Sequence, residues 1–513
     1  MTAPESPATP GGALGDLAEH MARTHASNVA LVAIVTGTRI TYEMLADLVD
    51  QTALSLSGKG LRGGDVVGLR TANNVEYVVG LLGAARAGLV TVPLDPALPR
   101  DEQQTRLKRV GARGVLTDQA AKAADGCPDM LLEVAAPGPT GPQCEVHGSP
   151  AASADPSLVG LSPSDALVMF TSGTTAMPKM VPWTHEGLNA AMTNVANAYR
   201  LVPTDSTVAV MPMFHGHGLV AGLLATLSTA GCIGLPTKGR FSAHHFFDEL
   251  NTVEATWFTA VPTIHQILLD AATEGEAAGS RLRFLRSCSA PLPPEVARRL
   301  EATFEAVVLP AYGMTEATHQ ACAVSASADA QTRLRTVGEP TGTELRITDE
   351  GGATSPAGVT GEVWLRGPAV TRGYLNNARA TADTFIDGWL RTGDLGSVDP
   401  SGVLTLEGRI KNIINRGGEK ISPEHVEDTL LAHPDITQAA VFAMPDAKYG
   451  EQVVAAVTLR AGARCDDDAL EGFCAERLPR YEVPERILRV NELPVTAKGS
   501  VDRNRLAEAF GTA

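Results

Sequence analysis

Short apolar segments rich in β-branched residues alternate with amphipathic stretches along the first three quarters of the chain. The apolar segments that predict strands are 65-DVVGLR-70, 90-VTVPL-94, 113-RGVLT-117, 166-ALVMF-170, 207-TVAVM-211 and 306-AVVLP-310. Between them, 76-EYVVGLLGAARAG-88 and 185-HEGLNAAMTNVANAYR-200 carry apolar residues at helical spacing. Strands that alternate with helices are typical of parallel sheets built from βαβ units. We therefore expect a large α/β domain.

The pattern changes at about residue 343, where short apolar segments follow one another with Gly and Asp between them, as in 345-LRITDEGGATSPAGVTGEVWLRG-367. Closely spaced strands with turn residues between them are typical of antiparallel sheet. We expect a β subdomain over about 343–410, which closes an N-terminal domain spanning 14–410.

A second change follows 408-GRIKNIINRGGEKISPEHVEDTLLAHP-434. Beyond it, 439-AAVFAM-444 and 453-VVAAVTL-459 predict strands of a compact α+β unit. We place a boundary near Lys411 and expect a small C-terminal domain over 411–513. Residues 1–13 are rich in Pro, Ala, Thr and Gly, and we expect them to be disordered.

Composition narrows the classes of function. The formal net charge of −16 disfavours nucleic acid as a partner, because phosphate neutralisation needs a basic face. The seven cysteines are scattered without metal-ligand spacing, which favours a reducing compartment. No signal peptide is visible, and apolar runs such as 218-GLVAGLLATL-227 are too short to span a bilayer. We expect a cytoplasmic protein with no membrane span, and the pattern leaves the oligomeric state open.

A polar loop follows one of the predicted strands. The segment 166–170 runs into 171-TSGTTAMPKMV-181, which offers hydroxyl groups, backbone N–H groups and the charge of Lys179. Such a loop suits phosphate, although it lacks the Walker A spacing. An ordinary polar turn is the alternative. The residues expected to hold phosphate are Thr171, Ser172, Gly173, Thr174, Thr175 and Lys179.

This loop is the first of seven segments that occur in a recognisable order. The others are 213-MFHGHGL-219, 288-CSAPLPPE-295, 311-AYGMTEATHQ-320, 389-WLRTGDLG-396, 408-GRIKNIINRGGEKISPEHVE-427 and 494-PVTAKGSVDRNRL-506. Together they resemble the acyl-CoA ligases of the adenylate-forming superfamily, which includes luciferase and peptide-synthetase adenylation domains. The resemblance covers nearly the whole chain. The segments 214-FHGHGLVAGLL-224 and 312-YGMTEATH-319 look closest to ligases of oxalate and other small acids.

The resemblance implies a two-step reaction and a mobile C-terminal domain. In such enzymes a carboxylate attacks the α-phosphate of ATP to give acyl-AMP, and the thiol of CoA then attacks the acyl carbon and releases AMP. The small C-terminal domain rotates between the steps. The implied ligands are therefore a carboxylic acid, the AMP moiety of the acyl-adenylate and CoA, with Mg²⁺ as the metal that accompanies phosphate.

The family pattern also assigns roles to single residues. It places the adenylate against Thr171, Ser172, Ser289, Ala290, Pro291, Tyr312, Gly313, Met314, Thr315, Asp394 and Arg409. In this assignment Tyr312 stacks on adenine, Thr315 contacts the α-phosphate and Glu316 holds Mg²⁺, which prefers oxygen ligands. Asp394 accepts both ribose hydroxyls, with Arg409 reinforcing that contact. The alternatives are a core tyrosine, a helix-start carboxylate at Glu316 and an ordinary turn residue at Asp394.

Further roles follow from the same resemblance. His215 corresponds to the aromatic gate between the acyl group and the thiol path, and Lys411 falls on the hinge position. A metal pair formed with His217 is an alternative for His215, but no third ligand has suitable spacing. The residues expected to bind CoA are Arg416, Gly417, Gly418 and Glu419. The small residues Gly216, Gly218, Ala221 and Gly222 are compatible with a roomy acyl site.

The chain departs from the family pattern at its last motif. Family members read P-x-T-x-x-G-K-[IV]-x-R, and their lysine bridges the carboxylate and the α-phosphate during adenylation. Here 494-PVTAKGSVDR-503 has Ser500 at that position, with Lys498 two residues earlier. Attack of one anion on another needs a cation at the meeting point, whereas thioester formation starts from an activated anhydride. We therefore expect adenylation from ATP to be weak or absent.

The phosphate loop departs from the pattern as well. Ala176 and Met180 replace two glycines of the usual T-S-G-T-T-G-x-P-K-G. A Cβ at a glycine position with positive φ would strain the loop and crowd phosphate. Like Ser500, this change of the phosphate loop predicts weak or absent adenylation from ATP.

Three interpretations remain open at this stage. The combination resembles most closely the non-adenylating, thioesterification-only acyl-CoA ligases of platensimycin and platencin biosynthesis, which receive the adenylate of a bulky terpenoid acid from a separate adenylating enzyme. Residues i and i+2 of an extended strand share a face, so in an extended segment Lys498 reaches the phosphate in place of Ser500. In that interpretation the chain is a complete two-step ligase. A non-catalytic adenylate-binding protein is the third interpretation.

Overall fold

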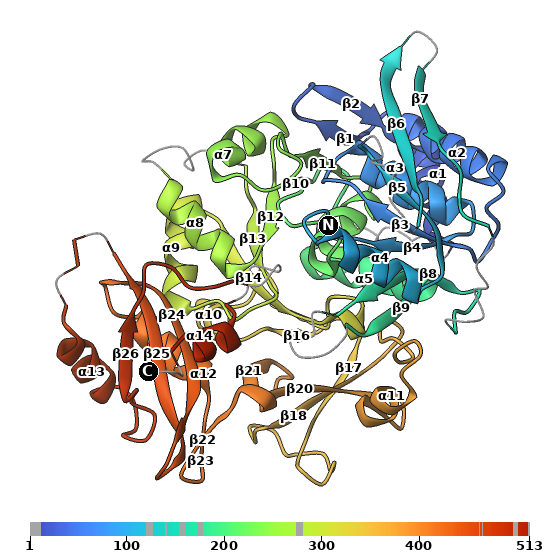
Figure 1. The fold of residues 1–513 in the computed structure, drawn as a ribbon. Coiled ribbons are helices and arrows are strands. Elements are labelled where there is room, and N and C mark those ends of the chain that lie inside the picture. The colour runs from blue at the N-terminus through green and yellow to red at the C-terminus, as the bar shows by residue number, and fades with distance from the viewer. Residues whose placement is uncertain are drawn as a thin grey trace.

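The computed structural model describes residues 12–119, 127–138, 141–152, 160–171, 178–272, 281–460, 462–463, 465–495 and 501–510, with only the backbone for 136–138. The chain forms a large N-terminal α/β domain and a small C-terminal domain, as the hydrophobic pattern predicts. Figure 1 shows the C-terminal elements, in orange and red, gathered at one end of the molecule.

A seven-stranded sheet organises the first part of the N-terminal domain. Its order is β7 (Gly141–His147), β6 (Asp129–Gly138), β5 (Ala112–Thr117), β3 (Val66–Arg70), β4 (Val90–Pro93), β8 (Asp165–Phe170) and β9 (Met180–Thr184). The strands from β6 to β8 are parallel, and antiparallel β7 and β9 close the two edges. The predicted βαβ arrangement is therefore confirmed for the interior of this sheet.

Two further sheets complete the α/β part. One has the order β10 (Ser206–Val208), β11 (Cys232–Leu235), β1 (Val29–Ala33) and β2 (Thr38–Thr41). The other has the order β12 (Trp257–Ala260), β13 (Phe284–Ser287), β14 (Val307–Tyr312), β15 (Cys322–Ala323) and β16 (Glu339–Pro340). Strands β12, β13 and β14 are parallel, so their carboxyl ends lie at one edge. Ligands of α/β sheets bind at such edges.

The predicted antiparallel sheet follows. It consists of β17 (Glu344–Thr348), β18 (Gly361–Arg366), β20 (Trp389–Val398) and β19 (Phe385–Ile386), with β21 (Leu404–Arg409) paired to β20. The C-terminal domain contains β23 (Glu419–Ile421), β22 (Ile414–Arg416), β25 (Gly450–Leu459) and β24 (Ile436–Asp446), with β26 (Arg486–Arg489) paired to β25. Its sheet carries a hydrophobic cluster on each face.

Helices surround these sheets. They are α1 (Leu17–His25), α2 (Tyr42–Gly58), α3 (Val75–Arg86), α4 (Arg100–Arg109), α5 (His185–Tyr199), α6 (Ala225–Ser228), α7 (Ala243–Thr252), α8 (Pro262–Ala271), α9 (Pro294–Phe304), α10 (Ala330–Arg335), α11 (Ala378–Thr384), α12 (Pro423–Leu431), α13 (Asp467–Ala475) and α14 (Arg503–Phe510). Shorter turns are η1 (Leu14–Asp16), η4 (Thr315–Ala317) and η5 (Ile410–Asn412), and η3 (His217–Leu224) is a π-helix. Polar caps start several helices, as when the Thr184 hydroxyl accepts from the Gly187 N–H at the start of α5.

Two sequence expectations need correction. The strand predicted over 207–211 ends at Val208, because the side-chain amide of Asn73 donates to the carbonyls of Ala209 and Met211 in place of a neighbouring strand. Met180 was expected to strain the phosphate loop, but it lies in β9 without positive φ, and its side chain is buried against Leu375 and Val168. The strain argument is therefore wrong for Met180.

Residues 1–11 of the segment expected to be disordered lie outside the described part, and the Gly12 carbonyl accepts from the Asn189 side chain at 2.6 Å. Within the described ranges, we find no helix with the length and apolar character needed to cross a membrane.

Arg503, at the start of α14, ties this helix to the C-terminal sheet. Its Nη2 lies 2.7 Å from Oε1 and 2.8 Å from Oε2 of Glu427, and its Nε donates to the Val441 carbonyl at 3.0 Å. Burial raises the pKa of Glu427 to about 7, and Arg503 opposes that shift. This contact matters for function, because α14 directly follows the motif that contains Ser500.

Replacing Arg503 by Met should destabilise the C-terminal domain by about 2–4 kcal/mol near neutral pH, since a largely buried carboxylate loses its partner. Without Arg503 the pKa of Glu427 rises further above its unfolded value, so the variant is stabilised by protonation at low pH and loses that stability as pH rises. Urea unfolding at about pH 5 and about pH 8 should therefore show a larger deficit at the higher pH.

Arg505→Met is the matched control, because Arg505 lies on the same helix and is exposed. It should leave the unfolding midpoint nearly unchanged. Equal midpoints for the Arg503→Met and Arg505→Met variants would contradict the anchoring role of Arg503.

Candidate active site

Three parallel strands end at residues that the sequence singles out. β8 leads into Thr171, β14 ends at Tyr312, and the chain after β13 reaches Ser289 two residues beyond the strand. The two sheets that carry them are joined by the Trp183 indole of β9, whose Nε1 donates to the Thr315 carbonyl at 2.8 Å. The expected adenylate residues therefore come from the carboxyl edges of two sheets.

Asp394 connects the third sheet to the β subdomain. Its Oδ2 accepts from the Tyr312 hydroxyl at 2.6 Å, and its Oδ1 lies 2.7 Å from Nε of Arg409, its partner across β20 and β21. Burial raises the pKa of Asp394, while Arg409 and Tyr312 oppose the shift. Asp394 lies in a strand rather than in a turn. Each carboxylate oxygen has a second lone pair, so these contacts leave acceptor sites that suit ribose hydroxyls.

The base of the phosphate loop is linked to Glu316. The Thr171 N–H donates to the Lys179 carbonyl at 3.0 Å, and the Lys179 N–H donates to the Thr171 hydroxyl at 3.2 Å. Nζ of Lys179 lies 4.3 Å from the centre of the Tyr374 ring, and the Tyr374 hydroxyl donates to Oε1 of Glu316 at 2.8 Å. Glu316 is buried. The chain thus brings a cation over the ring of Tyr374 and a carboxylate to its hydroxyl group.

Other expected loop residues lie outside the described part of the chain. These are Ser172, Gly173, Thr174, Thr175 and Ala176. The same holds for Lys498 and Ser500, although the flanks of their segment are described. Val495 and Val501 form an antiparallel bridge, and the Asp502 N–H donates to the Pro494 carbonyl at 2.8 Å.

The turn after Tyr312 requires a glycine. A Cβ on Gly313 would lie 1.4 Å from the His319 carbonyl oxygen, so no side chain fits there. Met314 follows in extended conformation, its carbonyl accepts from the His319 N–H, and Thr315 begins η4. The close approach of Gly313 to His319 holds Thr315 and Glu316 in a compact turn beside Tyr312.

The structure contradicts two interpretations of the segment around His215, namely a metal pair and a roomy acyl site. His217 makes hydrogen bonds through both ring nitrogens, to Ser289 and to Thr259, so it is not poised as a metal ligand with His215. A Cβ on Gly216 would lie 2.9 Å from the Trp183 ring, and one on Gly218 would lie 2.3 Å from the Pro212 carbonyl. These two glycines therefore satisfy close packing and do not indicate a roomy acyl site. Ala221 and Gly222 are buried within η3, and a Cβ on Gly222 would meet only the His217 carbonyl oxygen, at 3.9 Å.

A set of buried polar residues near Ser289 was not anticipated from the sequence. Arg286 of β13 contacts Tyr199, Thr259, His319 and Gln320. Its sequence signal is an arginine within the apolar strand 284–287. Trp183 and Tyr374, which hold Thr315 and Glu316, carried no such signal.

The residues expected to bind CoA form a hairpin of the C-terminal domain. Arg416 and Glu419 pair across β22 and β23, and Gly417 and Gly418 form the two-residue turn with φ of 61° and 97°. Both values favour glycine, as in a type I′ turn. The Gly417 N–H donates to the Tyr449 carbonyl at 2.7 Å, and the hairpin reaches the N-terminal domain through Lys420 and Glu350. The described contacts of this hairpin do not include Thr315 or Glu316.

Lys411, expected at the hinge, lies in η5 between β21 and β22. Its pKa is lowered by partial desolvation of the ammonium group and by the nearby Arg409. It therefore lies between the last strand of the β subdomain and the first strand of the C-terminal sheet.

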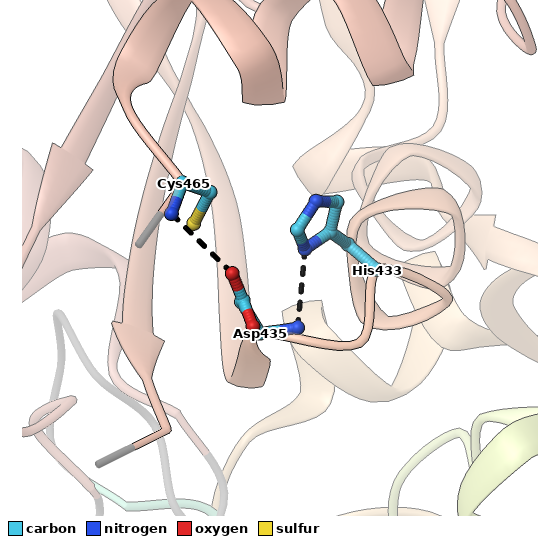
Figure 2. Close-up of side chains that lie close together, drawn as sticks. All are labelled: His433, Asp435 and Cys465. Carbon is cyan, nitrogen blue, oxygen red and sulfur yellow. Dashed lines mark hydrogen bonds between the residues drawn. The ribbon is translucent and has the colours of Figure 1, made fainter. Parts of the chain in front are cut away.

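A different group of residues has the chemistry of metal ligands. His433, Asp435 and Cys465 present ligand-type atoms within 4.8 Å of one another in the C-terminal domain (Figure 2). Nδ1 of His433 accepts from the Asp435 N–H at 3.1 Å, and the Cys465 N–H donates to Oδ2 of Asp435 at 3.4 Å. These bonds tie two loops together, and none of the three residues belongs to the expected magnesium site at Glu316.

The comparisons with known proteins agree with this geometry. The family model described as AMP-binding enzyme matches residues 18–375, and the one described as AMP-binding enzyme C-terminal domain matches 425–500. The probable CoA ligase CCL9 of Humulus lupulus is 42% identical over 483 residues, covering 92% of this chain and 91% of the relative. The oxalate–CoA ligase of Arabidopsis thaliana is 40% identical over 491 residues, covering 92% and 93%.

A solved structure extends the likeness to the fold. ATP-bound MatB from Rhodopseudomonas palustris superposes with a TM-score of 0.84 at 28% identity, covering 97% of this chain and 99% of that one. The chain therefore belongs to the AMP-binding enzymes, the adenylate-forming family of acyl-CoA ligases.

Proposed function

We propose that this acyl-CoA ligase carries out only the second half of the family reaction, converting acyl-AMP and CoA into acyl-CoA and AMP. The CoA sulfur attacks the acyl carbonyl carbon and a C–S bond forms. The bond between that carbon and the phosphate oxygen breaks, and AMP leaves with the electron pair. The thiol proton is released to solvent. No ATP is consumed in this step.

Ser500 at the position of the adenylating lysine carries the proposal. The segment is held at both flanks: Pro494 and Val495 contact Asp502 and Val501, and Arg503 is bound by Glu427. These contacts hold Val501 and Arg503, the residues that follow Ser500 in the motif.

The energetic consequence differs between the two steps. Adenylation joins a carboxylate to a phosphate, and a serine hydroxyl offers a neutral dipole where a full positive charge is needed. Loss of one preorganised stabilising group commonly lowers a rate by roughly 10²–10³-fold. Thioester formation begins from an anhydride in which the two anions are already joined, so the same substitution should affect it little.

The adenylate-holding residues support catalysis over simple decay of the site. Asp394, Tyr312 and Arg409 are in direct contact, and Glu316 is held by Tyr374. Such a set suits AMP and the acyl-adenylate. By the resemblance to the platensimycin and platencin ligases, we further propose that the acid is a bulky terpenoid-type acid and that a separate enzyme supplies its adenylate.

A complete two-step, ATP-dependent ligase is the second candidate. Lys498 lies in the same motif as Ser500, and the CoA-ligase names of the relatives favour this candidate. The third is a protein that binds the adenylate without turning it over. The two following experiments separate all three.

The first prediction compares two starting points in the same enzyme preparation. With synthetic acyl-adenylate and CoA, we expect rapid formation of acyl-CoA; with the free acid, ATP, Mg²⁺ and CoA, we expect a rate at least about 10²-fold lower. Chromatography of the thioester measures both. Equal rates would establish the two-step ligase, and tight adenylate binding with no thioester from either mixture would establish the binding protein.

The second prediction concerns the lysine position itself. Ser500→Lys should raise acid-dependent pyrophosphate release by roughly 10²-fold or more, because it restores a cation at the meeting point of the two anions. Lys498→Ala is the matched control in the same segment and should leave thioester formation from the adenylate nearly unchanged. Our account of Ser500 would be wrong if the Ser500→Lys variant released no more pyrophosphate than the unaltered enzyme, or if Lys498→Ala severely slowed thioester formation.

A further inference from the structure

Three side chains with different ligand chemistry meet in the C-terminal domain. His433 and Asp435 lie in the turn between α12 and β24, and Cys465 lies directly before the residue that caps α13 (Figure 2). One nitrogen, one oxygen and one sulfur atom of the three side chains lie within 4.8 Å of one another. Within the described ranges, no other group of three His, Cys, Asp or Glu side chains comes as close.

The turn that carries His433 and Asp435 is held by backbone groups. The Ile436 N–H donates to the His433 carbonyl at 3.1 Å, and the Arg460 N–H donates to the Asp435 carbonyl at 2.8 Å. Nε of Arg460 also donates to the Pro434 carbonyl, at 3.1 Å. These bonds order the turn before any ion arrives, which lowers the entropic cost of binding one.

Helix α13 fixes the remaining parts of the cluster. The His433 ring packs edge-on against Phe473, with ring centres 4.9 Å apart and ring planes at 81°. The Asp466 side chain accepts from the Ala469 N–H at the start of the helix, which places Cys465 one residue before the cap. All three side chains of the cluster are half-buried, so an ion can reach them from solvent.

The carboxylate of Asp435 lies against Cys465. The Cys465 N–H donates to Oδ2 of Asp435 at 3.4 Å, and partial desolvation together with this carboxylate raises the pKa of the thiol. Arg489, which is paired with Asp467, opposes that shift. A carboxylate and a thiolate repel each other at such a distance. A divalent cation would pair with both and remove that repulsion.

A cysteine, a histidine and an aspartate can also form a catalytic triad, but their arrangement here differs from one. A nucleophilic cysteine needs a base within hydrogen-bond reach and a lowered pKa. The described hydrogen bonds of Cys465 go to Asp435 rather than to His433, and Asp435 raises the pKa of the thiol. The geometry therefore favours metal ligation over nucleophilic catalysis.

Metal binding would break one existing hydrogen bond. Nδ1 of His433 accepts from the Asp435 N–H at 3.1 Å, so the neutral ring carries its proton on Nε2. An ion at Nδ1 replaces that N–H, and an ion at Nε2 moves the ring proton to Nδ1. The cluster loses the same bond in both cases. The net contribution of one neutral hydrogen bond is small beside the free energy of a zinc site.

The set of ligands selects the metal. Ca²⁺ and Mg²⁺ prefer sites built from oxygen, whereas imidazole, thiolate and carboxylate are the usual protein ligands of Zn²⁺. We propose that His433, Asp435 and Cys465 bind a Zn²⁺ ion that joins the turn before β24 to the start of α13, with water in the fourth tetrahedral position. None of the three belongs to the residues expected to bind adenylate, magnesium or CoA, so this inference is independent of the proposed function.

Cobalt reports such a site directly, because Co²⁺ replaces Zn²⁺ and its bond to a thiolate gives a charge-transfer band in the near ultraviolet. Titration of the reduced, metal-free full-length chain with Co²⁺ should produce this band, with saturation at one equivalent per chain. Addition of Zn²⁺ should abolish the band, whereas excess Mg²⁺ should leave it unchanged. Absence of the band would overturn the proposal.

Variants assign the band to the cluster. Cys465→Ser should remove it, because the sulfur ligand is lost. Asp435→Asn keeps the thiol and the backbone N–H, so the band should remain while the affinity for Co²⁺ falls by at least about tenfold, since loss of an outer partner of a ligand alone has that effect. Cys127→Ser is the matched control, because Cys127 is another half-buried cysteine, and it should change neither the band nor the affinity.

Urea unfolding gives a second readout. Zn²⁺ should raise the unfolding midpoint of the unaltered protein and of Cys127→Ser, because it binds the folded state, and it should leave that of Cys465→Ser unchanged. If Cys465→Ser does not fold, the Co²⁺ affinity of Asp435→Asn decides alone. A band that survives Cys465→Ser, an Asp435→Asn affinity equal to that of the unaltered protein, or a zinc-induced shift retained in Cys465→Ser would overturn the proposal.

Discussion

The burial of one carboxylate constrains much of this molecule. Asp394 is only 3% exposed and receives a proton donor on each oxygen, Tyr312 from the third sheet and Arg409 from the last strand of the β subdomain. A buried carboxylate is tolerated only when its oxygens are satisfied. These two contacts therefore fix the position of the third sheet relative to the β subdomain. Arg409 also directly precedes η5, which leads into the C-terminal domain. The expected adenylate contacts and the start of the C-terminal domain therefore share one anchor.

Charge is distributed differently over the rest of the site. Lys179 and Glu316 are joined through Tyr374, whereas Arg286 lies beneath Ser289 with neutral partners. The expected phosphate side thus has both signs of charge, and the segment that begins at Ser289, expected along the adenylate, has a buried cation beneath it.

Local sequence signals predicted the fold better than the details of the site. Apolar segments and helical spacing identified several strands and the helices α3 and α5, and ordered motifs brought Tyr312, Asp394 and Arg409 into consideration together. Met180 was misjudged, because a motif position does not reveal that its side chain enters a strand and a hydrophobic core. Trp183 and Tyr374 were missed, because their contacts to Thr315 and Glu316 join segments far apart in the chain. Long-range side-chain contacts of this kind leave no periodic trace.

The central claim is that the enzyme does not join the carboxylate to the phosphate. Exchange of labelled pyrophosphate into ATP reports that step alone, because label enters ATP only when an acyl-adenylate forms and reverses. We predict no acid-dependent exchange above background from enzyme that converts the matching acyl-adenylate to acyl-CoA. Exchange at a rate similar to thioester formation would contradict the account and identify the protein as a complete two-step ligase.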